Sequence, residues 1–154
     1  MKNRKAQFAV VFFCFILAFA LAACKDDAYT AAAKASADVS GAVGVAITAT
    51  SDLYAQKLIT QAEKNAVATV LLNVTDANTQ FRVQVKALHA NPVTTKAQYL
   101  TAASSFVQSA QVLLASGDLH VKDPAAQAKL TTVLNAIQTG LDGIATAITA
   151  AKGS

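Results

Sequence analysis

The sequence predicts an all-α fold, an up-down-up-down four-helix bundle that follows a cleaved N-terminal signal helix. Three observations support this fold class. Alanine, the strongest helix former, makes up roughly a quarter of the chain, whereas only two prolines occur. Apolar or small residues recur at alternating steps of three and four in four segments, which is the spacing of a seam between packed helices. The connections between the segments are short, which favours antiparallel neighbours.

Capping signals indicate where the helices begin and end. Thr60-Gln61-Ala62-Glu63 fits a capping box, and Thr95-Lys96-Ala97-Gln98 fits a second one just after Asn91-Pro92. Gly117 is a stop signal after the third segment, and Asp123-Pro124 combines an N-cap residue with proline at the first helical position. We therefore expect helices near residues 27–57, 60–90, 95–116 and 124–151.

Each segment contains a periodic set of residues that we expect to form the core. The sets are Tyr29, Ala32, Ser36, Val39, Val43, Ala46, Thr50 and Leu53 in the first segment; Val67, Val70, Val74, Ala77, Phe81 and Leu88 in the second, with Gln84 out of pattern; Tyr99, Ala103, Phe106, Ala110 and Leu113 in the third; and Leu130, Leu134, Ile137, Leu141, Ile144 and Ile148 in the fourth. The first set is the weakest, because Ser36 and Thr50 are polar. Core packing is also expected for Tyr54, which lies near the first set.

Residues 39–51 fit a helix least well. This stretch has no charge, two glycines and several β-branched residues, so a strand or a helix break is an alternative there. Residues 40–46 resemble residues 139–145. Either tertiary packing tolerates weak helix propensity, or the first and last helices approach closely through these small residues. The second hypothesis predicts that Gly44→Leu destabilises the fold more than Ala35→Leu.

The N-terminus has the features of a secretory signal peptide. Lys2, Arg4 and Lys5 form a basic start, and an uncharged apolar run extends from Phe8 to Ala20. Small residues and a cysteine follow this run. Such an order of basic, apolar and small residues is typical of a segment that directs export and is then removed.

The last four residues of this region, Leu21-Ala22-Ala23-Cys24, resemble the lipobox of bacterial lipoproteins. In that family a diacylglycerol is attached to the cysteine thiol, and a dedicated peptidase cuts just before it. The resemblance implies that Leu21, Ala22 and Ala23 form the signal-peptidase motif and that Cys24 is the lipidation site.

The resemblance divides the chain into a lipoprotein signal peptide, residues 1–23, and a single helical-bundle domain, residues 24–154. The alternative is an uncleaved signal anchor, because residues 6–23 approach the length that spans a bilayer. That alternative leaves Cys24 and the small residues before it unexplained. Cys14 lies in the apolar run and would be lost with the signal peptide.

The resemblance also implies a location in the cell envelope, with the membrane itself as the first partner. Two or three acyl chains on Cys24 would anchor the protein firmly, since each buried CH₂ contributes about 0.8 kcal/mol. In lipoproteins of bacteria with two membranes, Asp directly after the cysteine commonly retains the protein in the inner membrane. Here Lys25 has that position, which favours the outer membrane, facing the periplasm.

The charge of the expected mature chain argues against nucleic-acid binding. Three of the 13 Lys and Arg residues lie in residues 1–23, whereas all nine Asp and Glu residues follow Cys24, so residues 24–154 carry ten basic and nine acidic residues. No basic face interleaved with aromatic residues is evident, and such a face is the footprint of a nucleic-acid binder. Cys24 is the only cysteine of this part, so no intrachain disulfide is expected.

The residues that could carry catalysis are sparse, and we expect no enzyme activity, no cofactor and no metal. Glu63 is the only glutamate and is already explained as a cap. His89 lies in the last turn of the second helix, where it suits the helix C-terminus. Asp118, His120 and Asp123 could converge on a metal, but their spacing matches no ligand signature, so an exposed polar loop is the simpler interpretation. The helical carboxylates are scattered, as expected of solvated faces: Asp38, Asp52, Asp76 and Asp142.

These observations predict a lipid-anchored cell-envelope bundle with a structural or protein-interaction role, offering a helical face to an envelope protein or to copies of itself. One alternative is a periplasm-facing module that binds a small apolar ligand between its helices. Another is a phage- or plasmid-encoded envelope lipoprotein that acts in exclusion or lysis. Leu72, Val83, Val112 and Leu114 lie outside the expected seams, and an interaction role needs some of them on the surface.

Overall fold

A computed structural model describes residues 28–116 and 121–151. In these residues the chain forms four α-helices and no strand: α2 (Ala28–Ala55), α3 (Gln61–Ala90), α4 (Lys96–Ser116) and α5 (Pro124–Ala150). The all-α prediction is confirmed, and each boundary lies within two residues of the expected one. The predicted signal peptide lies outside the described residues.

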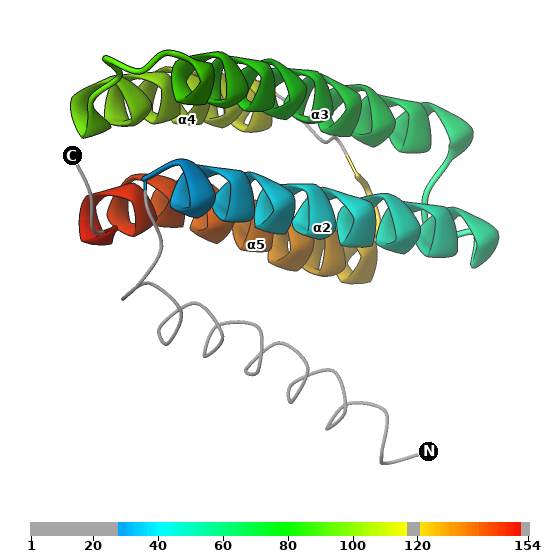
Figure 1. The fold of residues 1–154 in the computed structure, drawn as a ribbon. Helices are drawn as coiled ribbons and strands as arrows, with labels where there is room; N and C mark the ends of the chain where they lie inside the picture. The colour runs from blue at the N-terminus through cyan, green and yellow to red at the C-terminus, as the bar shows by residue number, and fades with distance from the viewer. Residues whose placement is uncertain (1–27, 117–120, 152–154) are drawn as a thin grey trace.

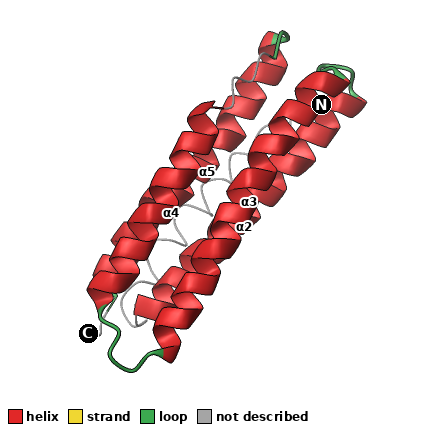
Figure 2. Cartoon of the chain, turned by 90° about the horizontal axis from the view of Figure 1, so that it is seen from above, coloured by secondary structure: helices red, strands yellow, loops and turns green. Residues whose placement is uncertain are grey.

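The four helices run along one axis with alternating direction (Figures 1 and 2). Helices α2 and α5 form one layer of the bundle, and α3 and α4 form the other. Each helix packs against the two that neighbour it around the bundle, and the most extensive contact is between α2 and α5. The predicted up-down-up-down topology is therefore correct, and the first and last helices are adjacent.

The predicted capping signals act at three helix starts. The Thr60 hydroxyl accepts the N–H of Glu63 at 3.2 Å, and Oε2 of Glu63 accepts the N–H of Thr60 at 2.6 Å, which completes the capping box. The Gln98 side chain accepts the N–H of Thr95 at 2.8 Å before α4, which is one of the two bonds of the predicted capping box. Asp123 caps α5, with proline following it at the helix start. Pro92, by contrast, lies in the loop before α4 rather than at the helix start.

Helix α2 is continuous through residues 39–51, so the alternative of a strand or a break is wrong. The hydroxyls of Ser40, Thr48 and Thr50 each donate to the backbone carbonyl four residues earlier, at 3.2, 3.1 and 2.7 Å. These bonds satisfy the hydroxyl donors within the helix itself. The bond of Thr50 explains how this polar residue lies buried at an expected core position.

The core follows three of the four expected seams. In α2 every expected position is buried except Tyr29, which is half-buried. In α4 and α5 only Leu113 and Leu134 are half-buried, and the other expected positions are buried. Among the aromatic residues, Tyr54 is 38% exposed, which corrects the expectation that it packs in the core.

The seam of α3 differs from the expected one at alternate positions. Its buried residues are Val67, Leu71, Val74, Asn78, Phe81 and Val85, so Leu71 and Asn78 replace the predicted Val70 and Ala77, and Val85 is buried beside Gln84, the position already out of pattern. Val70 and Ala77 are half-buried, and Gln84 is exposed. The pattern missed Asn78 because a polar amide has no place in an apolar periodicity.

Asn78 is buried because α2 satisfies its amide. Oγ of Ser36 donates to Oδ1 of Asn78 at 2.7 Å. Nδ2 of Asn78 donates to the carbonyl oxygen of Ser36 at 2.9 Å and to Oγ of Ser40 at 2.8 Å. A buried polar group is tolerated when its hydrogen bonds are made, so this cluster links α2 to α3 at one fixed point.

The glycines of α2 do not mediate the contact with α5. A Cβ added at Gly41 or Gly44 would meet nothing within 4 Å, whereas one added at Gly140 would lie 3.4 Å from Cγ2 of Val39. Ala35 is only 2% exposed. The predicted order of Gly44→Leu and Ala35→Leu is therefore wrong, because the alanine occupies the packed position and the glycine faces open space.

Helix α2 ends in a left-handed turn at Lys57, whose φ is 59°. The N–H of Leu58 bonds the carbonyl of Leu53 at 3.0 Å, and the N–H of Lys57 bonds that of Tyr54 at 2.9 Å. This pair of bonds is the Schellman motif, in which glycine usually has the left-handed position. The turn directs the chain towards Thr60 and the start of α3.

Candidate functional site

The predicted lipidation site and its peptidase motif lie outside the described residues. Cys24, with Leu21, Ala22 and Ala23, precedes the first described residue, Ala28, by a few positions. What the structure adds is the part of the bundle that follows this segment. The two ends of the bundle are the candidate sites among the described residues.

The near end of the bundle is defined here as the end where α2 begins, with Ala28, the loop 91–95 and Ala150 (Figure 1). Lys96 connects the start of α4 to the end of α5 here. Its Nζ donates to the carbonyl oxygens of Thr149 and Ala151 at 2.6 and 2.7 Å. Thr149 lies in the last turn of α5 and Ala151 is its C-cap residue, so the lysine caps that helix and complements the negative end of its dipole.

An aromatic pair lies at the same end. The ring of Tyr29 in α2 stacks on that of His89 in α3, with centroids 3.8 Å apart and an interplanar angle of 18°. His89 is the basic residue of the last turn of α3, as the sequence predicted. The stack gives the histidine a packing role that the sequence did not indicate, because its partner lies far away along the chain.

The far end of the bundle comprises the turn 56–60 and residues 121–123. Glu63 links these two segments. Its Oε2 accepts from Thr60, and its Oε1 accepts the backbone N–H of Lys122 at 2.9 Å. The bonds from Thr60 and then from Lys122 lower the pKa of Glu63 below its ordinary value. The carboxylate therefore fastens the start of α3 to the segment before α5.

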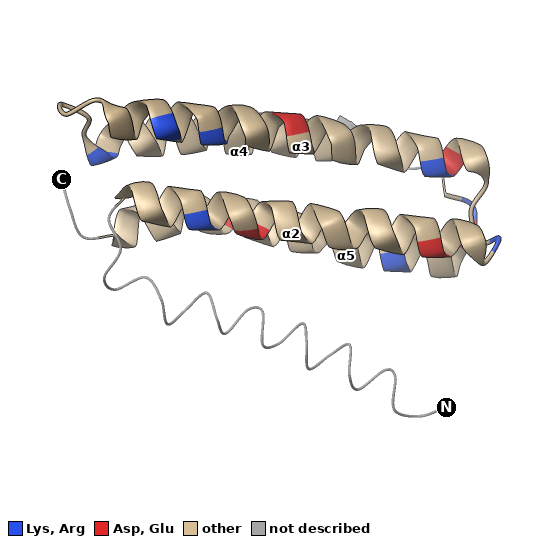
Figure 3. Ribbon diagram, turned by 45° about the vertical axis from the view of Figure 1, so that its right-hand side comes forward, with Lys and Arg blue, Asp and Glu red and all other residues tan. Residues whose placement is uncertain are grey.

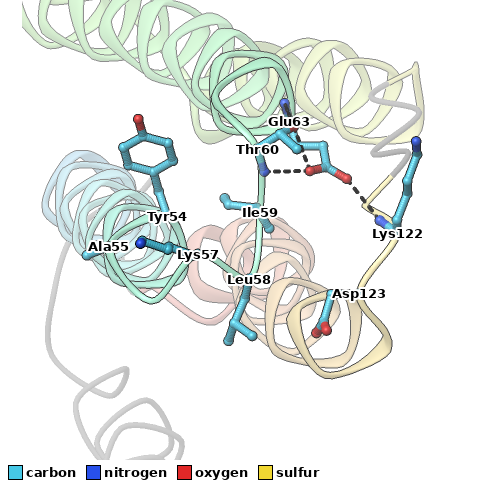
Figure 4. Close-up of a pocket in the computed structure, with 9 residues that line it drawn as sticks. All are labelled: Tyr54, Ala55, Lys57, Leu58, Ile59, Thr60, Glu63, Lys122 and Asp123. Carbon is cyan, nitrogen blue, oxygen red and sulfur yellow. Dashed lines mark hydrogen bonds between the residues drawn. The ribbon is translucent and has the colours of Figure 1, made fainter.

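An open pocket lies at this far end (Figure 4). Its lining residues are Tyr54, Ala55, Lys57, Leu58, Ile59, Thr60, Glu63, Lys122 and Asp123. Nζ of the neighbouring Lys64 lies 4.6 Å from the centroid of the Tyr54 ring, a cation–π distance. The pocket is thus a solvent-facing depression between the ends of helices rather than a cavity inside the bundle.

The carboxylates of this pocket are engaged in capping. Oδ1 of Asp123 accepts the N–H of Ala126 at 2.8 Å, and Glu63 is held as described above. A general acid or base needs a proton-transfer group free to face a substrate. Glu63 and Asp123 accept hydrogen bonds from backbone donors at two helix starts.

Most of the scattered carboxylates are exposed, as expected. Asp52, Asp76 and Asp142 are exposed, and Asp142 accepts hydrogen bonds from Gln111 and Gln138. Asp38 differs because it is half-buried. Burial raises the pKa of Asp38, and the nearby charge of Lys34 partly opposes this shift.

Within residues 28–116 and 121–151, no three His, Cys, Asp or Glu side chains lie close enough to hold a metal ion. Asp118 and His120, which the sequence grouped with Asp123 as possible metal ligands, lie outside the described residues. The same residues contain no helix long and apolar enough to cross a membrane.

Several large apolar side chains lie on the bundle surface. Leu72 and Val83 on α3 are 59% and 64% exposed, and Val112 on α4 is 66% exposed. Leu114, which the sequence grouped with them, is half-buried. Leu72 and Val83 are three helical turns apart, so both lie on one face of α3.

Comparisons with protein-family models, with curated proteins and with solved structures find no match to this chain.

Proposed function

We propose that this chain is a lipid-anchored protein of the bacterial cell envelope, with a structural or protein-interaction role and no enzymatic activity. One observation carries the proposal. Leu21-Ala22-Ala23-Cys24 follows a basic and then apolar N-terminus, the order of a signal peptide that ends in a lipobox. Acyl chains on Cys24 hold the protein at the membrane, and α2 begins four residues later, at Ala28.

The engagement of the polar side chains supports a non-enzymatic role. Glu63 and Asp123 cap helix starts, and Lys96 caps the end of α5. In an active site such groups would converge on a reacting atom instead. The ligand-binding alternative receives less support, because Phe81 and Phe106 stack in the core with centroids 4.9 Å apart and fill space between α3 and α4.

The exposed face of α3 supports an interaction role. Leu72 and Val83 present apolar surface on the same side of the helix, where burial against a partner removes it from water. An envelope protein or a second copy of the chain is the proposed partner of this face.

Membrane fractionation tests the anchor and its location. We expect the wild-type protein in the outer-membrane fraction of a two-membraned cell, because Lys25 is not the Asp that retains lipoproteins. Cys24→Ala removes the acylated thiol and is expected to prevent lipid-dependent anchoring, whereas Lys25→Asp shifts the protein to the inner membrane. Outer-membrane recovery of Cys24→Ala at the wild-type level contradicts the proposal.

Crosslinking in whole cells tests the interaction role. The variant Leu72→Gln/Val83→Gln changes the proposed face, and Val112→Gln changes an equally exposed valine on α4 as a matched control. We expect the wild type and the control to give the same crosslinked species and the α3 variant to lose it. If all three proteins stay uncrosslinked, the interaction role is wrong.

A further inference from the structure

The near end of the bundle carries positive charge and no acidic side chain among its described residues. Lys34, Lys86 and Lys96 lie within about 10 Å of this end along the helix axes, counted at 1.5 Å per residue. No Asp or Glu of the described residues lies within that distance. Figure 3 shows the difference, with blue residues alone at the left-hand end and both colours at the right.

The far end has no such charge excess. Within the same distance it carries Lys57, Lys64, Lys122 and Lys129 together with Asp52, Glu63 and Asp123. Helix dipoles do not alter this comparison, because two helices begin and two end at each end of the bundle. The flanking residues of the near end in the sequence, Lys25, Asp26, Asp27 and Lys152, contribute no net charge.

An apolar tip projects from the same end. The loop between α3 and α4 contains Pro92 and Val93, and Val93 is 76% exposed, the most exposed of the large apolar residues described. Val93 therefore lies in the loop at the near end, three residues before Lys96, rather than on a helix face. An apolar side chain flanked by lysines is the combination that binds at the interface of an anionic bilayer.

The length of chain before α2 limits how far this end can be from the membrane. Four residue steps separate Cys24 from Ala28, and four extended residues span at most about 14 Å. An acylated Cys24 lies at the bilayer surface, so the near end lies within that distance of the headgroups. The far end is a whole helix length away, about 45 Å for the 30 residues of α3.

We infer that the near end of the bundle is a second membrane contact, in which the exposed Lys34 and Lys86 face anionic lipid headgroups, Lys96 adds its charge while it caps α5, and Val93 enters the interface. The orientation part of this inference rests on the proposed anchor at Cys24. The contact with anionic lipid does not rest on that anchor, because side chains of the bundle make it. The contact would hold the bundle upright, with its far end directed away from the membrane.

Vesicle sedimentation of a protein without acyl chains tests the contact. The protein is the mature chain, residues 24–154, with Cys24→Ser, and helical circular dichroism with a cooperative melt is checked first. Vesicles contain phosphatidylcholine alone or phosphatidylcholine with one-third phosphatidylglycerol. We expect measurable partitioning only into the anionic vesicles, weakening as salt is raised.

Two matched pairs of variants locate the contact. Lys34→Gln/Lys86→Gln removes two near-end charges and is expected to lower the partition coefficient about 25-fold, or fivefold per lysine. Lys57→Gln/Lys129→Gln removes two far-end charges and is expected to change it less than twofold. Val93→Asp is expected to weaken binding strongly, whereas Val112→Asp, on the side of α4, leaves it nearly unchanged.

The possible results distinguish a failure of the lipid contact from a failure of the proposed anchor at Cys24. Equal losses from the near-end and far-end pairs, or no partitioning into anionic vesicles, overturn the contact. Neither result bears on acylation, because the protein tested has no Cys24. Conversely, vesicle binding by the near end together with an unacylated Cys24 in cells retains the contact and overturns the anchor.

Discussion

The side chains of Ser36 and Asn78 join α2 to α3 from within the core. The two residues are 42 positions apart in the sequence, and the hydroxyl of one meets the amide of the other at 2.7 Å. Both are almost fully buried, at 0% and 3% exposure. Any shift of α3 along α2 would leave these polar atoms buried without partners, so the pair favours one register over its neighbours.

A double-mutant cycle measures this relationship. Asn78→Ala leaves the Ser36 hydroxyl without its partner, and we expect it to lower the free energy of unfolding by about 2–4 kcal/mol through lost packing and an unsatisfied hydroxyl. Ser36→Ala is expected to cost less, because Asn78 keeps its bonds to the Ser36 carbonyl and to Ser40. Urea unfolding of both single variants and the double variant should give a coupling energy of about 1 kcal/mol or more. Additive losses of stability would show that the contact between the two side chains does not favour one register of α3 along α2.

We expect leucine substitutions at two small residues of α2 to affect stability in the opposite order from the one predicted from the glycine pattern. Ala35→Leu forces three extra carbon atoms into a packed site, which we expect to lower the free energy of unfolding by about 1–3 kcal/mol. Gly44→Leu adds its Cβ in open space on an exposed position and is expected to raise it by about 0.5–1 kcal/mol, because leucine is a better helix former than glycine. Thermal melting of the two variants decides the order. A more stable Ala35→Leu protein would show that position 35 is not a tightly packed site.

The left-handed residue at the end of α2 can be improved. Among the described residues, Lys57 is the only residue other than glycine with a positive φ, and the left-handed conformation costs such residues about 1–2 kcal/mol. We expect Lys57→Gly to raise the free energy of unfolding by about 1 kcal/mol in a denaturant titration. Gln56→Gly, one residue earlier, serves as the control and is expected to be neutral or destabilising. A gain from both would point to a general effect of glycine in this turn.

The link made by Glu63 should depend on pH. The pKa of Glu63 is lowered in the folded protein, so its contribution to stability is present above its ordinary value, near 4.5, and is lost as the pH falls through the lowered pKa. Glu63→Gln retains one acceptor oxygen for the capping box and loses the second, which binds the N–H of Lys122. We expect a lower Tm for this variant at pH 7, and a difference from wild type that shrinks as the pH is lowered below 4.5. A difference independent of pH would exclude the carboxylate charge as its cause.

The local signals of the sequence predicted the helices well because each depends on residues close together in the chain. The Thr60–Glu63 capping box and Asp123-Pro124 lie within one turn of the helix starts they mark. The α2 seam was correct even at Thr50, whose hydroxyl bonds within its own helix. Periodicity thus recovered positions at which the side chain is either apolar or satisfied locally.

The sequence could not predict features that join distant segments. Asn78 disrupts the apolar periodicity of α3, and only its contact with Ser36 of another helix explains its burial. In the sequence Lys96 is an ordinary first-turn residue, and only the fold brings the end of α5 next to it. The near end of the bundle could not be predicted for the same reason, because Lys34, Lys86 and Val93 belong to separate segments that only the bundle topology brings together.

The most direct test of the central claim is the intact mass of the protein extracted from membranes, measured beside a Cys24→Ala variant. The account predicts a mass equal to residues 24–154 plus acyl chains. It also predicts that the variant lacks both the acyl mass and the lipid-dependent membrane association. A membrane-bound protein with the mass of all 154 residues and no lipid would contradict it, and would identify a signal-anchored bundle instead.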